Sequence, residues 1–495
     1  MPITVSTYTD LSNAIASPPA DGLIYVGANI SLTAPIASPT KATITLASDP
    51  SGAGPYTLTA ATSTVPVIKF SAATVATTQN IILDGGNIGG GIYGEAGTTL
   101  NLNSGTVIQN CLNTVNGSYS SAVSSAQATL NINGATIQNC RNTSGNNNGG
   151  AIYASATTAF PGTFNFTSGT ISNCSSTAAG GAITCATAVT MNMSGGTISN
   201  CSAGTYGGGI FTSGATLNLS GGSILNNTST NYGGGIYMNT GTLNVTNNPL
   251  IQGNKAATGA GIYVNSITGT INGGTVNQNT SSGVGGGIYD YNSTVTMANM
   301  TVTNNVGTSG GGIYLNSGTL AMSNNTVSFN TASNSGGGMF EYNCPTTLSG
   351  DVFSNNTAVS SGGAILVYGG SVTMNAGTVL ENNETTAASS YGGGVYVSNG
   401  GTFNLYGGTI QGNESALGAG ICNYASNLII DGTAGGTVAC SQNMPQILNN
   451  GSLAASAYPA TVRGGGIFQQ AASLTIGCCQ ITGNAAQYGA GIFMA

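Results

Sequence analysis

The chain carries almost no charge and contains no histidine and no tryptophan, although it is 495 residues long. Charged residues make up 3% of the sequence, against about 25% in ordinary globular proteins. Its five basic residues are too few to neutralise a phosphate backbone, so nucleic acid is not expected as a partner. The net charge of −7 is spread thinly and forms no acidic tail. Asparagine, serine and threonine supply most of the polarity instead.

Long apolar runs and a basic leader are also missing. No stretch of about 18 apolar residues occurs, so neither a membrane-spanning helix nor membrane insertion is expected. Residues 1–7, MPITVST, hold neither the basic segment nor the apolar segment of a secretory signal peptide. The low charge and the ten cysteines still favour an extracellular or cell-surface location.

A short repeat fills most of the chain. It consists of two small residues, an aliphatic residue and usually an aromatic residue, and it reads GGIY at residues 90–93 and AGIF at residues 490–493. Between residues 210 and 365 the aliphatic position recurs every 25 or 26 residues. A period held this closely indicates one supersecondary unit stacked upon itself.

Each repeat carries three short strand signals separated by clusters of Gly, Asn and Ser. In residues 216–220, alternation places Leu217 and Leu219 on one face and Asn218 on the other. Short strands with an equivalent one period later predict an all-β fold, a single right-handed parallel β-helix. We expect roughly 18 coils with three strands each. The paired glycines are expected at a tight corner that needs positive φ or a close approach between coils.

The first part of the chain is less regular. Residues 8–15 predict a short helix with Thr9 or Asp10 as its N-cap. We expect residues 1–84 to form this cap helix and atypical first coils, because terminal repeats of solenoids are usually atypical. Regular repeats are expected over residues 85–495.

Two intervals in the repeat region are longer than the others. The 46 residues between Ile421 and Ile467 predict an excursion near 431–463. The 60 residues between Ile92 and Ile152 leave room for one further coil near residues 122–123.

Part of the repeat resembles a known family. The sequence GGAI at residues 149–152, 180–183 and 362–365 is similar to the GGAI repeat of the chlamydial polymorphic outer-membrane proteins, and FSNN at 353–356 overlaps their FxxN motif. The resemblance covers about residues 85–495 and implies a surface-exposed passenger used in adhesion. The start of the chain resembles pectate-lyase-like β-helices, which implies a fold and no activity.

One polar position recurs three residues after the aliphatic residue of the third strand. We call this set the corner ladder: Cys111, Cys140, Cys174, Cys201, Asn227, Asn254, Asn279, Asn305, Asn330, Asn355, Asn382, Asn413, Asn450 and Asn484. Asparagine at such a corner is expected to satisfy turn backbone and its equivalents in adjacent coils. The four cysteines predict either a buried thiol stack or one or two disulfides between coils. Without histidine or a Cys-x-x-Cys pair, neither zinc nor another cofactor is expected.

An aromatic residue follows the aliphatic residue in most repeats. We call this set the aromatic stripe: Tyr93, Tyr153, Phe211, Tyr237, Tyr263, Tyr289, Tyr314, Phe340, Tyr396, Phe468 and Phe493. If the aliphatic residues point inward, these rings point outward along one continuous edge. Such rings either stack on one another and stiffen the coil or form a contact line with other chains or glycans.

No catalytic constellation is evident, and we expect no enzyme activity. The acidic residues are scattered, and only Asp290 and Glu341 share a face by register, two repeats apart. No basic side chain accompanies them, whereas lyases and hydrolases need converging acid, base and stabilising groups.

These observations predict three functions. The first is an extracellular structural protein that assembles head-to-tail into a filament, because the last repeat is not followed by the rest of its unit and an open strand edge can pair with another copy. The residues expected at the assembly ends are Ile3, Val5, Ile492, Phe493 and Met494. The alternative is a surface adhesin that binds a host surface or glycans. An ice-binding face built on the column from Asn101 to Asn244 is less favoured, because the column continues as Thr296, Ala321 and Thr373.

Overall fold

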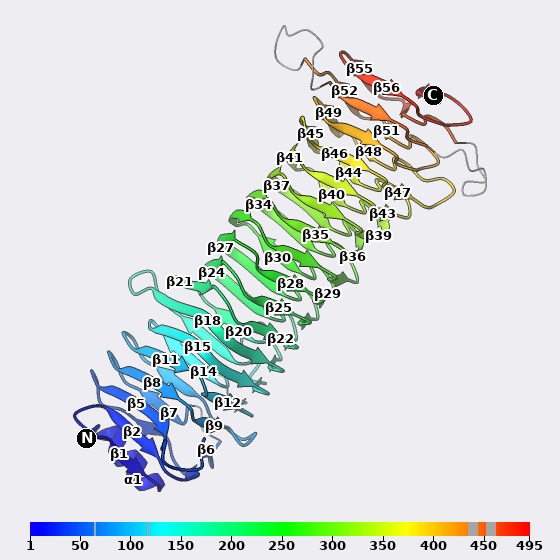
Figure 1. The fold of residues 1–495 in the computed structure, drawn as a ribbon. Helices are drawn as coiled ribbons and strands as arrows, with labels where there is room; N and C mark the ends of the chain where they lie inside the picture. The colour runs from blue at the N-terminus through cyan, green and yellow to red at the C-terminus, as the bar shows by residue number, and fades with distance from the viewer. Residues whose placement is uncertain (64–65, 116, 118, 434–443, 452–461) are drawn as a thin grey trace. The chain divides into compact units, whose positions relative to one another are not determined.

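The computed structural model describes residues 1–63, 66–115, 117, 119–433, 444–451 and 462–495 (Figure 1). It is a parallel β-solenoid of about 17 turns with 53% strand and 2% helix, which confirms the predicted fold class. The chain divides into two compact units, residues 1–255 and 256–495, here called the first and the second unit. The excursion predicted near 431–463 lies mainly outside the described residues.

A single short helix stands at the start of the first unit. Helix α1 (Tyr8–Ala16) packs against strands β1 to β4 and buries Leu11 and Ile15. Its N-cap is Thr7, rather than the predicted Thr9 or Asp10. Thr7 is the last residue with extended backbone, so its hydroxyl oxygen can accept the free backbone N–H of Asp10 at 3.2 Å. Among the described residues, no helix is both long and apolar enough to cross a bilayer.

The first strand is already paired within the chain. Strand β1 (Ile3–Val5) lies parallel to β2 (Leu23–Val26), and Val5 is buried. Residues 3–5 would have to leave this pairing before they could pair with another copy. At the other end, β57 (Ile492–Met494) pairs with β54 (Ile467–Gln470), and Met494 is 71% exposed.

A regular coil of the first unit has more strand than the sequence predicts. Strand β24 (Ile210–Leu219) joins the first two predicted strands, and β25 (Ser223–Leu225) is the third. A fourth, two-residue strand follows as β26 (Thr228–Ser229) and pairs with β23 (Ser202–Ala203) in a separate sheet. Two residues are too few to leave a period-2 pattern in the sequence.

Successive coils pair equivalent residues. Strand β24 pairs with β27 (Ile236–Thr246) so that Leu217 lies beside Leu243 and Asn218 beside Asn244. The leucines are buried and the asparagines face outward, as alternation predicts. The further coil predicted near residues 122–123 is present, because β14 (Val123–Ala126) pairs with both β10 (Ile92–Gly94) and β17 (Ile152–Ser155).

The paired glycines meet both of the predicted requirements at one corner. Gly207 has φ +63°, a conformation that favours glycine. Gly208 has ordinary φ, but a Cβ there would collide with the backbone oxygens of Thr228 and Gly234 in the next coil. One glycine therefore serves the turn and the other the close approach of coils.

The second unit repeats this arrangement. Its first strands include β40 (Met339–Tyr342), β44 (Ile365–Tyr368), β48 (Val395–Ser398) and β51 (Ile421–Tyr424), which lie side by side in that order (Figure 1). Each is followed across a corner by a second strand, such as β52 (Asn427–Ile430) after β51. These first strands and corners position the site described below.

Candidate functional site

The corner ladder of the second unit is a continuous column of hydrogen-bonded amides. The backbone N–H and Nδ2 of Asn305 both donate to Oδ1 of Asn330 at 3.0 Å, and the same Nδ2 donates to the carbonyl of Val276 at 3.0 Å. Each buried amide therefore satisfies backbone in its own corner and in its neighbours. The column consists of Asn279, Asn305, Asn330, Asn356, Asn383, Asn413, Asn450 and Asn484.

Two members of the predicted ladder were placed one residue too early. Asn356 and Asn383 occupy the buried positions, whereas Asn355 and Asn382 precede them with φ +54°. The cause is a pair of adjacent apolar residues in each third strand. The inward residue at residues 352–353 is Phe353, so counting three positions from Val352 gives the wrong asparagine.

In the first unit the corner ladder begins with thiols. Cys111, Cys140, Cys174 and Cys201 are buried and free, so the structure contains the thiol stack rather than disulfides between coils. Burial raises the pKa of Cys140 and Cys174 well above the ordinary thiol value, which keeps them protonated and unreactive. Asn227 continues the ladder by accepting the backbone N–H of Cys201 at 2.9 Å, and Asn254 follows it.

No described cluster of acids or thiols forms a reactive or metal-binding site. Asp290 and Glu341 share a core column with Leu315 between them, and their exposed fractions are 4% and 0%. Burial raises the pKa of Asp290 to about 6 and that of Glu341 to about 8. Within the described ranges, no group of three or more His, Cys, Asp or Glu residues is placed to hold a metal ion.

The aromatic stripe is interrupted in the first unit. Ser124 stands between Tyr93 and Tyr153 in the register, and Thr184 stands between Tyr153 and Phe211. The prediction of one continuous edge was therefore wrong for these coils. Beyond Phe211, only the stack with Tyr237 at a centroid distance of 5.6 Å follows within the first unit.

In the second unit the stripe is a true stack over four coils. The ring centroids of Tyr263, Tyr289, Tyr314 and Phe340 are 4.7, 5.3 and 4.7 Å apart, and adjacent rings are nearly parallel. The stripe then continues through mixed positions: Leu366, Tyr396, Cys422, Phe468 and Phe493. Phe468 and Phe493 stack at 5.6 Å.

A second outward column runs two residues after the stripe, and sequence inspection overlooked it. It contains Tyr342 and Tyr368, whose ring centroids are 5.4 Å apart, followed by Ser398 and Tyr424. The signal was present in the sequence, because alternation places residues two apart on one face of a strand. We call this set the outer tyrosine column.

A groove of about 590 Å³ opens where the two aromatic columns meet. Tyr368, Tyr396 and Tyr424 supply rings to it, and Tyr424 is 41% exposed. Its lining carries hydroxyl and amide groups but no charge. The complete lining is Asn334, Ser335, Phe340, Ser361, Leu366, Tyr368, Tyr396, Ser398, Asn399, Tyr424 and Ala425.

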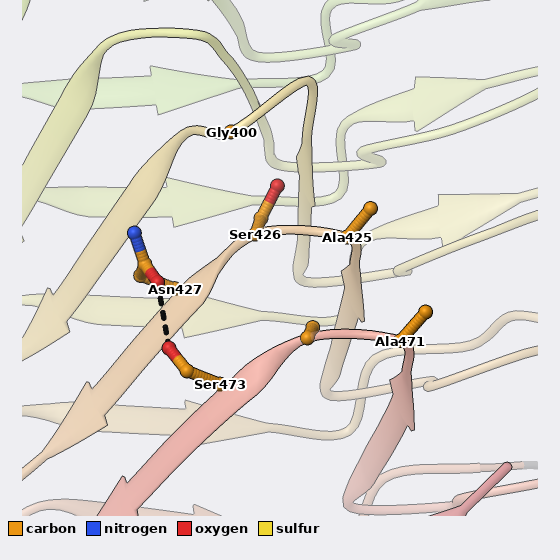
Figure 2. A pocket seen from close by; sticks show the side chains of 7 residues that line it. Gly400, Ala425, Ser426, Asn427, Ala471 and Ser473 are labelled. Atoms are coloured by element: carbon orange, nitrogen blue, oxygen red, sulfur yellow. Dashed lines mark hydrogen bonds between the residues drawn. The ribbon is translucent and has the colours of Figure 1, made fainter.

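A second pocket of about 430 Å³ begins at Ala425 and covers the corner between the first and second strands. Figure 2 shows that small side chains line it and that the hydroxyl of Ser473 lies against the amide of Asn427, at 2.6 Å. The hydroxyl of Ser426 is buried and has no hydrogen-bond partner among the described residues. Because Ala425 lines both cavities, the groove and this corner pocket adjoin.

The first unit presents a different outer surface on its second strands. Its asparagines form a hydrogen-bonded ladder, in which each Nδ2 donates to Oδ1 of the preceding coil at 2.7–2.8 Å. We call this the outer amide ladder: Asn101, Asn131, Asn165, Asn192, Asn218 and Asn244. A threonine column runs beside it, two residues earlier on each strand.

Comparison with known proteins finds no match for this chain among protein-family models, curated proteins or solved structures.

Proposed function

We propose that this chain is a non-catalytic surface protein that binds neutral glycans through the groove of the second unit. The groove, lined by three tyrosines, amides and hydroxyls without a charge, is the observation that carries the proposal. The proposal agrees with the adhesive role that the resemblance to chlamydial polymorphic outer-membrane passengers implies.

The chemistry of the lining favours a sugar over other ligands. Aromatic faces pack against apolar surfaces such as the C–H face of a sugar ring. Amides and hydroxyls such as Asn399 and Ser361 can hydrogen-bond to sugar hydroxyls. An anionic ligand finds no cation in the lining, and a purely apolar ligand would leave these polar groups unsatisfied.

The scaffold suits binding more than catalysis. Specific sites need side chains held by their surroundings, and the amide ladder fixes the corner of every coil behind the groove. The nearest buried carboxyl in the register is Glu341, which faces the core rather than the groove. A rigid, uncharged groove without a general acid or base supports recognition alone.

Saturation-transfer NMR on the whole chain tests the proposal, with maltose, cellobiose and lactose as neutral probes. We expect signals from at least one probe and a loss of about tenfold in affinity for Tyr424→Ala, because a ring contact worth about 1.4 kcal/mol is removed. The matched control is Tyr232→Ala in the first unit, whose ring is 37% exposed and lies outside the groove. Absence of binding to all three probes, or equal losses in both variants, would contradict the proposal.

Head-to-tail assembly through Ile3, Val5, Ile492, Phe493 and Met494 stays a prediction. Sedimentation of the purified chain tests it, because a filament former sediments as a polymer. The proposed glycan groove does not depend on the outcome, since none of these five residues lines it.

A further inference from the structure

We propose that one neutral sugar ring inserts at Ser398, between the rings of Tyr368 and Tyr424. This inference rests on the proposed function and names the place and manner of binding. It follows from an interruption in the outer tyrosine column that the rest of the stack does not contain.

The spacing of the stack defines what is missing. Where rings occupy adjacent coils of the second unit, their centroids lie 4.7–5.4 Å apart, close to the strand spacing. Tyr368 pairs in register with Ser398, and Tyr424 takes the same position one coil later. The backbones of the two tyrosines are therefore about 10 Å apart. One ring is absent from an otherwise complete three-ring stack.

A second position in the same column shows how such a gap is normally filled. Asn316 stands between Tyr291 and Tyr342 in the register. Its planar amide occupies the space of a ring and donates to the hydroxyl of Tyr289 at 3.3 Å. Ser398 has only a hydroxymethyl group, and the groove opens there rather than at Asn316. The serine therefore leaves a ring-sized slot that the asparagine closes.

The polar groups around the slot select a hydroxylated ring rather than an aromatic one. Ser335, Ser361, Asn334 and Asn399 line the groove beside the tyrosines. The hydroxyls of Ser335 and Ser361 lie 2.9 Å apart, which leaves acceptor positions on both oxygens. An aromatic side chain from another protein would cover these groups without satisfying them, at a cost of about 1–3 kcal/mol for each buried group.

The adjoining corner pocket gives the ligand a direction. It begins at Ala425 and leads to Ser426, Asn427 and Ser473 (Figure 2). The hydroxyl of Ser426 is buried and unpartnered, which is a costly arrangement unless a ligand satisfies it. A second sugar unit attached to the ring in the slot would lie over this pocket. We therefore expect disaccharides to bind more tightly than the monosaccharides they contain.

The test fills the slot and leaves the rest of the groove in place. In Ser398→Tyr, the new ring completes the stack between Tyr368 and Tyr424, so we expect a retained fold and a loss of about tenfold or more in affinity for the best neutral probe. In the control, Asn316→Tyr, a ring replaces an amide that already fills its gap, and affinity should be unchanged. Ser398→Asn provides a smaller filler should the tyrosine disturb the fold, and circular dichroism checks both. Glucose and galactose are compared with cellobiose and lactose in the same assay.

The outcomes separate this inference from the proposed function. Binding that survives in folded Ser398→Tyr and Ser398→Asn overturns the slot and leaves the glycan groove standing. Absence of binding in the unsubstituted chain overturns both. Loss of affinity in the two Ser398 variants, but not in Asn316→Tyr, supports insertion of a ring at Ser398.

Discussion

The two units solve the same stacking problem with opposite choices of side chain. In the first unit the buried corner begins with four thiols, and the outer face carries hydrogen-bonded amides. In the second unit the buried corner consists of amides, and the outer face carries stacked rings. The backbone register is parallel in both. The comparison indicates that like must lie on like, whereas the kind of side chain is free to vary.

The largest difference is expected at the corner ladder. In Asn330→Ala, Asn305 loses both donors' acceptor, and the carbonyl of Val302 loses its donor at 2.9 Å. These groups are buried, so we expect a loss of about 3–5 kcal/mol in the free energy of unfolding. The counterpart in the first unit is Cys174→Ala, which removes a thiol contact of 3.2 Å to the carbonyl of Ser172 and should cost only about 1 kcal/mol.

Urea denaturation measures both costs, and hydrogen exchange locates them. Because solenoids lose structure locally, exchange of the Asn305 backbone amide should accelerate in Asn330→Ala and stay unchanged in Cys174→Ala. Equal losses of stability in the two variants would show that the amide column holds the corners no better than the thiol stack does.

A second difference concerns carboxyls in the core column two residues after the repeat aliphatic. The second unit has Asp290 and Glu341 there, whereas the first unit has Ala154, Cys185 and Thr212. The pKa of Glu341 is raised to about 8 from an ordinary value of 4.5. Between these values the folded chain keeps a proton that the unfolded chain has released. The free energy of unfolding should therefore fall as pH rises through this window and level off above it.

Glu341→Gln removes this titration and should flatten much of the decline. We expect a difference on the order of 2 kcal/mol between pH 5 and pH 9 in the unsubstituted chain that is largely absent from the variant. Exposed Glu384→Gln is the control and should leave the pH dependence nearly intact. A decline that persists unchanged in Glu341→Gln would place its origin elsewhere.

Much of the solenoid follows from spacing and alternation alone. The period predicts the stacked coils, and the parity of Leu217 and Leu219 predicts the core. The same parity places Asp290 in the core because it lies two residues after inward Ile288, so the burial of that acid could have been read from the sequence.

The groove could not be predicted in the same way. It depends on which residues of unequal coils meet: Tyr368 and Ser398 are 30 residues apart, whereas Ser398 and Tyr424 are 26 apart. The extra residues lie in a turn whose length does not alter the register of the strands. Only the register shows that a serine falls between two tyrosines. The cap of α1 was missed for a smaller reason, since Thr7, Thr9 and Asp10 are all acceptable N-cap residues.

The smallest expected effect lies on the outer faces. Asn165 joins two hydrogen bonds of 2.8 Å in the outer amide ladder, but water can replace them, so Asn165→Ala should cost only about 0.5 kcal/mol. Tyr314 stacks on Tyr289 and Phe340, and Tyr314→Ala should cost about 2 kcal/mol because apolar area is exposed as well. Urea midpoints of the two variants measure this contrast. A cost for Asn165→Ala as large as that for Tyr314→Ala would mean that the outer amides, like the rings, hold neighbouring coils together.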